Sequence, residues 1–230
     1  MPDDTLEKDI EKRFFDNLIN QEETFGNTAI NIYQKLVFLR YLEVIKNSFP
    51  LLLKEIDDEL LEKSVKEFMQ DTPSTPFVWK IPNDYRKFVK KNKIFKNQKY
   101  LYELMYFDWI EIEIYMKEYK FKKQKNFSYK ENYTLSKSAR IKSFKYDIIN
   151  GEYKNKRDNF LIVYYDFVTN DIVFREINQL IFLLIGNLNK KQSIGNFLKE
   201  LCLENEIDFK EAKRVLKDPL SELHFNKTII

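Results

Sequence analysis

The sequence predicts an α+β fold, in which an N-terminal all-α helical bundle precedes a small C-terminal α/β domain of three strands and three helices. Two observations predict it. Apolar residues recur at helical spacing as far as Met116, and strand-like stretches begin only after the lysine-rich segment that follows. We therefore expect a bundle over residues 1–120, a basic connector over 121–132 and the α/β domain over 133–230.

Two helices are expected before Pro50. The first ends before Gly26, and its apolar residues follow one another at i, i+4 spacing: Leu6, Ile10, Phe14 and Leu18. The second covers residues 30–47, after Asn27 and Thr28 as candidate N-caps, and ends there because proline disfavours helix at the preceding residue. Its expected apolar stripe is Tyr33, Val37, Tyr41 and Val44.

Three more helices are expected before the connector. Residues 51–69 form one, residues 71–76 with Pro82 form a loop, and a short helix around Tyr85 follows. The longest apolar run, residues 100–116, is interpreted as a central helix. Its last third also alternates like a strand, but a strand of that length is unusual. The expected stripe of this helix is Leu101, Met105, Trp109, Ile112 and Met116.

The C-terminal part predicts β-β-β-α-α-α. Strands are expected over 140–149, 160–167 and 172–175, and the turn signal at 169–171 makes the last two a hairpin. Helices are expected over 177–188, 194–203 and from Phe209 to about Leu216, the last ending before Pro219. Ser193 and Asp208 are their candidate N-caps.

Composition limits the function. The chain has 230 residues, a formal net charge of +3 and 43% hydrophobic residues, as expected of a globular protein with no strong demand for a polyanionic partner. The first residues are acidic, unlike a signal peptide, and the apolar run at 180–185 is too short to cross a bilayer. We expect a cytoplasmic protein with no membrane partner, and the single Cys202 excludes an internal disulfide.

Catalytic and metal-binding residues are scarce. With one histidine and one cysteine, the chain alone cannot build a zinc site of usual composition or a serine-histidine-aspartate triad. We interpret His224 as a surface residue of the tail and Cys202 as core packing. The pairs Glu103–Asp108 and Glu111–Glu118 are interpreted as solvated charge. The expectation is a non-enzyme with no cofactor and no metal of its own.

Basic residues leave a second interpretation open. Lysines interleaved with aromatic residues can bind phosphates and stack bases, and three helices beside a small sheet are similar to a winged helix-turn-helix. Nucleic acid is therefore an alternative partner, although lysine is common throughout this chain. The candidate contacts are Lys90, Lys91, Lys93, Lys122, Lys123 and Lys125.

Several short motifs together resemble the HvfC/BufC family, once labelled a putative DNA-binding domain, which includes MbnC-like partner proteins. Tyr33 followed by Phe49-Pro50 is similar to its N-terminal helix pair, and Asp108-Trp109 to its Glu-Trp. The other matching segments are 72–74, 100–104, 135–141, 145–148 and 161–165. Lys54-Glu55 lacks the usual glycine, and Asp147 replaces a proline.

The resemblance implies a non-catalytic partner of a multinuclear non-heme iron oxidative enzyme, which modifies cysteines of ribosomally made peptides in metal-stress-related maturation. The iron belongs to the enzyme, and the partner binds the leader of the precursor peptide. The family's C-terminal domain is similar to peptide-recognition elements, which capture a leader by strand addition.

The last strand before the helices is the expected peptide-binding edge. Alternation sends Ile172 and Phe174 to one face and Val173 and Arg175 to the other, and the apolar face is expected to pack on the helices. The helix that begins at Phe209 would form a second wall, with Lys213 at its rim. An edge simply blunted by its charges is the alternative interpretation.

Overall fold

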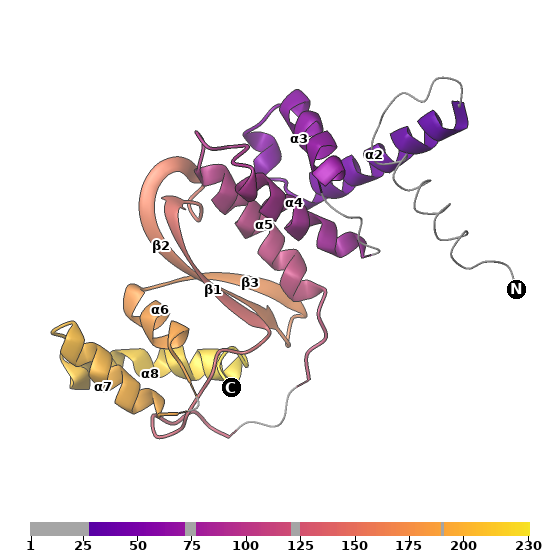
Figure 1. The fold of residues 1–230 in the computed structure, drawn as a ribbon. Helices are drawn as coiled ribbons and strands as arrows, with labels where there is room; N and C mark the ends of the chain where they lie inside the picture. The colour runs from indigo at the N-terminus through magenta and orange to yellow at the C-terminus, as the bar shows by residue number, and fades with distance from the viewer. Residues whose placement is uncertain (1–27, 72–76, 121–124, 190) are drawn as a thin grey trace, which may run out of the picture. The chain divides into compact units, whose positions relative to one another are not determined.

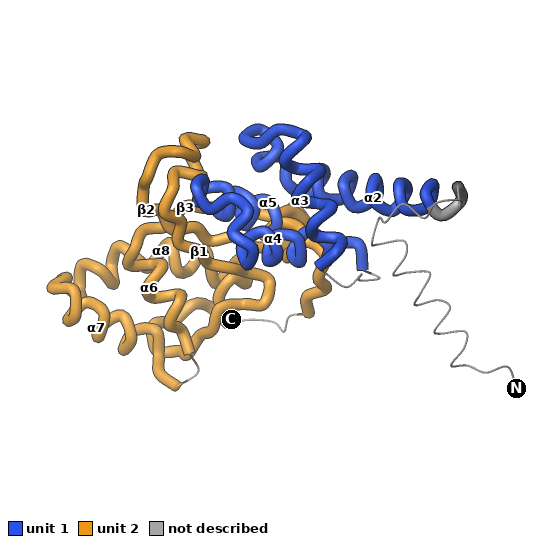
Figure 2. Tube along the Cα trace, turned by 45° about the horizontal axis from the view of Figure 1, so that its top comes forward, with its two compact units in different colours: residues 1–109 blue, residues 110–230 orange. Residues whose placement is uncertain are grey.

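The computed structural model describes residues 28–71, 77–120, 125–189 and 191–230, so the first expected helix lies outside the described residues. Within these ranges the fold is α+β, with four helices before a three-stranded antiparallel sheet and three after it (Figure 1). The chain divides into two compact units, residues 1–109 and 110–230 (Figure 2). The division falls inside a helix, earlier than the expected connector.

Unit 1 is helical in its described part. Its elements are α2 (Thr28–Ser48), the 3-10 turn η1 (Leu52–Lys54), α3 (Asp58–Asp71), the 3-10 turn η2 (Val78–Lys80), α4 (Ile81–Lys91) and the start of α5 (Tyr100–Tyr115). The helix expected over 51–69 begins only at Asp58, because the Asp57 carboxylate accepts the Leu60 N–H at 2.7 Å and so starts a new helix there. Pro82 lies in the first turn of α4 rather than in a loop, a position that needs no N–H.

Aromatic rings fill the centre of unit 1, where α3 and α4 pack together. Phe68 lies 5.4 Å from both Tyr85 and Phe88, measured between ring centroids. The fully buried Tyr85 hydroxyl is 2.6 Å from Ser64 Oγ, and burial raises the pKa of Tyr85 to about 12 although that hydrogen bond opposes the shift. The hydroxyl pair thus satisfies two polar groups inside an apolar core.

The buried face of α2 differs from the expected stripe. Leu42, Ile45 and Phe49 are buried, whereas Tyr33 is 54% exposed. Because α2 carries apolar side chains around most of its circumference, its spacing could not show which side packs against α3 and α4.

The central helix is confirmed as α5, with no strand inside residues 100–115. Its buried residues are Tyr100, Leu101, Leu104, Met105, Ile110 and Ile114. The expected stripe was therefore correct at its start and wrong at its end, since Met116 is 49% exposed. Trp109 is only partly buried, and the Arg86 guanidinium lies 4.4 Å from the centre of its ring.

Unit 2 is built on an antiparallel sheet in the order β1-β2-β3. The strands are β1 (Ala139–Asp147), β2 (Glu152–Asp166) and β3 (Asp171–Ile177). The β2–β3 hairpin is confirmed. β2 begins eight residues earlier than expected, because the polar stretch 152–159 pairs with the end of β1 across two register shifts instead of showing apolar alternation.

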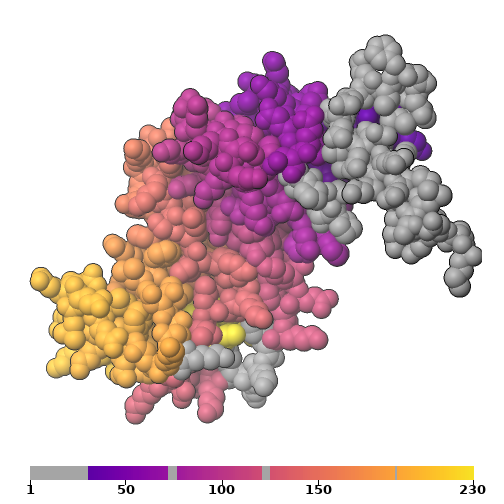
Figure 3. Space-filling view, in the orientation of Figure 1, coloured from indigo at the N-terminus to yellow at the C-terminus, as the bar shows by residue number. Residues whose placement is uncertain are grey.

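Three helices cover one face of this sheet: α6 (Gln179–Gly186), α7 (Ile194–Glu204) and α8 (Phe209–Phe225). Together they form a continuous orange-to-yellow surface (Figure 3). Ser193 and Asp208 accept the N–H groups of Asn196 and Glu211, so both expected N-caps are confirmed. α8 continues through Pro219, contrary to expectation, because the buried Leu220 and Leu223 offset the lost hydrogen bond.

The described part of the expected connector, 125–132, is packed into unit 2. Tyr129 O accepts the Gly195 N–H at 2.9 Å, and Glu131 O accepts the Ile194 N–H at 3.0 Å, so the connector supplies acceptors for the first turn of α7. A Cβ on Gly195 would lie 2.7 Å from Tyr129 O, which requires glycine at that position. Residues 125–132 are therefore part of unit 2.

Three helices end in a left-handed residue that is not glycine. The residues are Lys93, Glu206 and Lys227, with φ near +55°, and each follows an asparagine at the C-cap of α4, α7 or α8. In each case the next N–H bonds back into the last turn, as from Ile207 to Cys202 O at 2.9 Å. These helix ends are Schellman motifs in which a residue other than glycine adopts the left-handed conformation.

Replacing Tyr85 by Phe tests the hydroxyl pair in unit 1. We expect the free energy of unfolding to fall by about 1 kcal/mol, because one buried hydrogen bond is lost while Ser64 keeps its bond to Leu61 O. Urea denaturation measures this change. The matched control is Tyr115→Phe, which removes a hydroxyl from a 60% exposed ring; equal stabilities for the two variants would contradict the expectation.

Glycine at a left-handed helix end tests the strain there. Glu206→Gly is expected to raise the free energy of unfolding by up to about 1 kcal/mol, because glycine adopts positive φ without steric cost. The control Glu204→Gly places glycine in the last helical residue of α7 and is expected to destabilise. Thermal unfolding followed by circular dichroism compares them, and a Glu206→Gly variant less stable than wild type would overturn the prediction.

Candidate functional site

The clearest candidate site is the outer edge of β3. The sheet places β3 at one end, paired with β2 alone. Its register sets Ile177 opposite Phe160, Arg175 opposite Ile162 and Val173 opposite Tyr164. β3 is therefore an edge strand within the described sheet, as the sequence predicted, and one side of its backbone faces away from the other strands.

Hydrogen-bond directions identify which residues face that edge. The Tyr165 N–H donates to Ser138 O at 3.0 Å, so the backbone of Tyr165 is directed towards β1. Backbone groups alternate along a strand, so those of its neighbour Tyr164 are directed towards β3, where they meet Val173. It follows that Val173 and Arg175 bond to β2, and that Ile172, Phe174 and Glu176 direct their backbone groups outward.

A side-chain contact supports this assignment. The Asp171 carboxylate accepts the Ile172 N–H at 2.8 Å, which requires that N–H to be away from β2. The first outward N–H of the edge, that of Ile172, is therefore bonded to the carboxylate of the residue before it, and the next outward N–H along β3 is that of Phe174.

The two faces of β3 are the reverse of the expected ones. Val173 packs against the core formed with α6–α8, and the Arg175 guanidinium lies 2.8 Å from the Glu222 carboxylate of α8. Ile172 and Phe174 point to the other face. The alternation was predicted correctly, but the more apolar pair does not face the helices, because Ile177 and Val173 fix the phase of the strand against their core.

Charged groups flank this edge. Arg157 of β2 bridges two acids, Glu176 of β3 at 2.7 Å and Asp147 of β1 at 2.8 Å. Hydrogen bonding from Arg157 holds the pKa of Asp147 below its usual value, against the effect of burial. The network ties all three strands together near the C-terminal end of β3.

Lys213, expected at the rim of the second wall, lies beside Tyr129 of the segment that precedes the sheet. The Lys213 ammonium lies 5.2 Å from the Tyr129 ring centre and 5.8 Å from that of Phe209, and Tyr129 donates its hydroxyl proton to Lys213 O at 2.8 Å. Burial raises the pKa of Tyr129 to about 12, with a contribution from Asp218. These residues contact the segment that precedes the sheet, whereas the ion pair between Arg175 and Glu222 joins β3 to α8.

The lysines of the nucleic-acid interpretation are divided. Lys90, Lys91 and Lys93 are exposed at the end of α4 in unit 1, where Lys91 lies 3.7 Å from Asp71. Lys125 is exposed in unit 2, and Lys122 and Lys123 lie outside the described residues. The described lysines of this set therefore belong to two different units.

His224 is buried in α8, so its interpretation as a surface tail residue was wrong. Its Nε2 lies 2.8 Å from Lys125 O and its Nδ1 3.2 Å from Ile229 O, and the Tyr133 ring packs against it with centroids 5.1 Å apart. His224 thereby joins three separate segments of unit 2. Cys202 is buried in the core as expected, and burial raises the pKa of its thiol.

No carboxylate pair forms a metal site in the described ranges, where no group of three or more potential ligands is found. Asp108 has another role, since its carboxylate accepts the Leu51 N–H at 3.0 Å. This contact satisfies the amide at the start of η1, directly after Pro50. Nor does any helix in the described part of the chain have the length and apolarity needed to cross a membrane.

No family model matches this chain. A search of curated proteins likewise gives no match.

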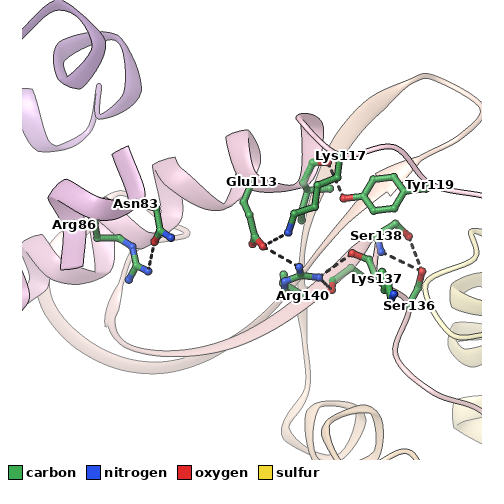
Figure 4. A network of polar contacts seen from close by, with 11 residues as sticks. Asn83, Arg86, Glu113, Lys117, Tyr119, Ser136, Lys137, Ser138 and Arg140 are labelled. Carbon is green, nitrogen blue, oxygen red and sulfur yellow. Dashed lines mark hydrogen bonds and ion pairs between the residues drawn. The ribbon is translucent and has the colours of Figure 1, made fainter. Parts of the chain in front are cut away.

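One polar cluster was not predicted from the sequence. Glu113 of α5 accepts hydrogen bonds from Lys117 and from Arg140 of β1, the latter at 2.9 Å (Figure 4). Arg140 also donates to Ala139 O and Lys137 O. Burial alone would raise the pKa of Glu113, but the two cations outweigh it and the pKa lies below its usual value. The cluster attaches the end of α5 to the first strand.

Substituting Glu113 by Gln tests this attachment through pH. A lowered folded-state pKa means that the carboxylate stabilises the fold above its usual pKa of 4.5, and that this contribution disappears as the pH falls through the folded-state value. We expect the variant to be less stable by about 1 kcal/mol at neutral pH, and the difference to shrink as the pH falls below 4.5. Urea unfolding at several pH values measures this difference in the free energy of unfolding. Glu111→Gln, at an exposed neighbour, is the control, and a pH-independent difference would refute the prediction.

Proposed function

We propose that this chain is a non-catalytic peptide-binding subunit, in which an extended peptide adds to the sheet beside β3. The observation that carries the proposal is the edge position of β3, with outward backbone groups from Phe174 to Glu176. Main-chain hydrogen bonds along such an edge supply affinity, and alternate side chains supply specificity.

The residues around the edge of β3 favour a peptide that carries both apolar and charged side chains. On the helix side of β3, Val173 supplies apolar surface and the pair Arg175–Glu222 supplies both charges. A peptide strand beside β3 would meet α8 near Glu222 on this side, so the last turn of α8 takes the place of Phe209 and Lys213 as the proposed second wall. Ile172 and Phe174 lie on the opposite face of β3.

The finer proposal rests on the resemblance of the sequence to the HvfC/BufC family. It is that the C-terminal fold acts as a peptide-recognition element, that the peptide is the leader of a ribosomally made precursor, and that the protein partner is a cytoplasmic multinuclear non-heme iron oxidative enzyme. The iron is assigned to that enzyme. The order of three strands and then three helices supports this proposal, because it supplies an edge strand with helices on one side.

A DNA-binding regulator is the alternative. Three exposed lysines at the end of α4 support this alternative: Lys90, Lys91 and Lys93. Attraction between these lysines and phosphates would weaken steeply with salt and would not depend on base sequence. Duplex binding that persists at physiological salt and differs between sequences would favour the regulator instead.

Proline substitutions along β3 test strand addition. Phe174→Pro removes an outward N–H and leaves the ladder to β2 intact, so we expect it to fold and to lose peptide binding. Val173→Pro removes an N–H that bonds to β2, so we expect it to be clearly destabilised. Peptides selected on the wild-type chain from a phage library of random linear sequences provide the probe, and fluorescence polarisation measures their affinity.

Phe174→Ala is the matched control, because it removes the same side chain but keeps the N–H. Selected peptides should bind Phe174→Ala more tightly than Phe174→Pro. Equal binding by a folded Phe174→Pro variant, or a library that yields no binding peptide, would refute strand addition at this edge.

A further inference from the structure

His224 lies between two backbone carbonyl groups of unit 2. Its Nε2 is 2.8 Å from Lys125 O, in the segment that precedes the sheet, and its Nδ1 is 3.2 Å from Ile229 O, after the end of α8. The histidine is buried, and so is Ile229. One imidazole ring thus connects α8 to two segments that are distant in sequence.

These two contacts require a proton on each ring nitrogen. A carbonyl oxygen only accepts hydrogen bonds, and a neutral imidazole has one N–H and one lone pair. In either neutral tautomer, one nitrogen would direct its lone pair at a carbonyl oxygen, and two acceptors in contact repel each other. The imidazolium has an N–H on both nitrogens and can bond to both carbonyls. We propose that His224 is a proton-binding site, at which the protonated ring joins Lys125 and Ile229 to α8.

The aromatic ring beside His224 favours the charged form. The ring centroids of Tyr133 and His224 are 5.1 Å apart, within the range of about 6 Å in which an aromatic ring attracts a cation. Phe127 stacks on Tyr133. Burial raises the pKa of Tyr133, and the charge of Glu131 adds to this effect, while the hydrogen bond with the Ser128 N–H opposes it. Tyr133 therefore faces the histidine as a neutral ring.

Charged side chains on the elements around His224 have contacts elsewhere. The Glu222 carboxylate lies 2.8 Å from the Arg175 guanidinium, and the Lys227 ammonium lies 4.7 Å from the centre of an aromatic ring in the β2–β3 turn. Lys125 is exposed and contacts the imidazole through its carbonyl oxygen. Burial by itself disfavours a charged ring, so the two hydrogen bonds must outweigh that cost. Bonds from a charged donor are about twice as strong as neutral ones, which favours this outcome.

Protonation of His224 stabilises the fold in acid. A proton that lies between two carbonyls of the folded chain is bound more tightly than in the unfolded chain, where water solvates both groups. The contribution of this proton to stability is therefore complete in acid. It is lost as the pH rises through and beyond the range in which a free histidine titrates, about pH 6.5.

Nuclear magnetic resonance tests the protonation directly. His224 is the only histidine, so a long-range ¹H–¹⁵N correlation spectrum of the labelled full chain reports on this imidazole alone. We expect the folded chain to keep both ring N–H groups at a pH at which the same chain unfolded in urea has largely lost one of them, about pH 7.5. Loss of a ring proton at the same pH as in the unfolded chain, or at a lower one, would overturn the proposal.

His224→Gln provides a second measurement, because its amide can donate a hydrogen bond but does not titrate in this range. We expect the folding equilibrium constant of wild type to fall several-fold more than that of the variant between about pH 5.5 and pH 8.5. Urea unfolding at each pH measures both constants, and the other titrating groups are common to the two chains. Equal pH dependence in a folded variant would contradict the proposal. The resonance measurement uses the unsubstituted chain, so it decides the proposal even where the variant does not fold.

Discussion

The arrangement of the C-terminal unit depends on the position of its central strand, β2. It is the only strand of the described sheet with neighbours on both sides, so its residues alternate between bonding to β1 and bonding to β3. Its buried run, from Leu161 to Tyr164, also places side chains on both faces. Once this strand is set, the phase of β3, the outward direction of the Phe174 backbone and the face that meets α6–α8 all follow. A shift of one residue would reverse each of them.

The order of elements could be predicted from the sequence because its signals are local. Ser193 and Asp208 cap the helices they precede, and the turn before Asp171 closes the hairpin it predicts. Helix faces could not be predicted in the same way. α2 and α5 are apolar around most of their circumference, so spacing alone did not separate the side that packs from the side that does not. The continuation of α8 through Pro219 likewise depends on burial of Leu220, which no local rule contains.

The candidate site, too, could be predicted from the sequence only in part. That β3 is an edge follows from its place as the last strand, and its alternation is a property of any strand. The direction of each amide, in contrast, depends on the register with β2, and the position of Lys213 depends on contacts with Tyr129, distant in sequence. His224 shows the same limit, since its carbonyl neighbours come from Lys125 and Ile229.

The helix ends have a chemical consequence. Asparagine ages by deamidation when the next backbone nitrogen attacks its side chain, and this attack is easiest when a glycine follows. Here Asn92, Asn205 and Asn226 are followed by lysine, glutamate and lysine, whose side chains hinder the approach. The amide groups are also held in place, as Asn205 Nδ2 is by Leu201 O at 2.8 Å. The non-glycine residues at these helix ends therefore slow a covalent damage that glycine in their place would favour.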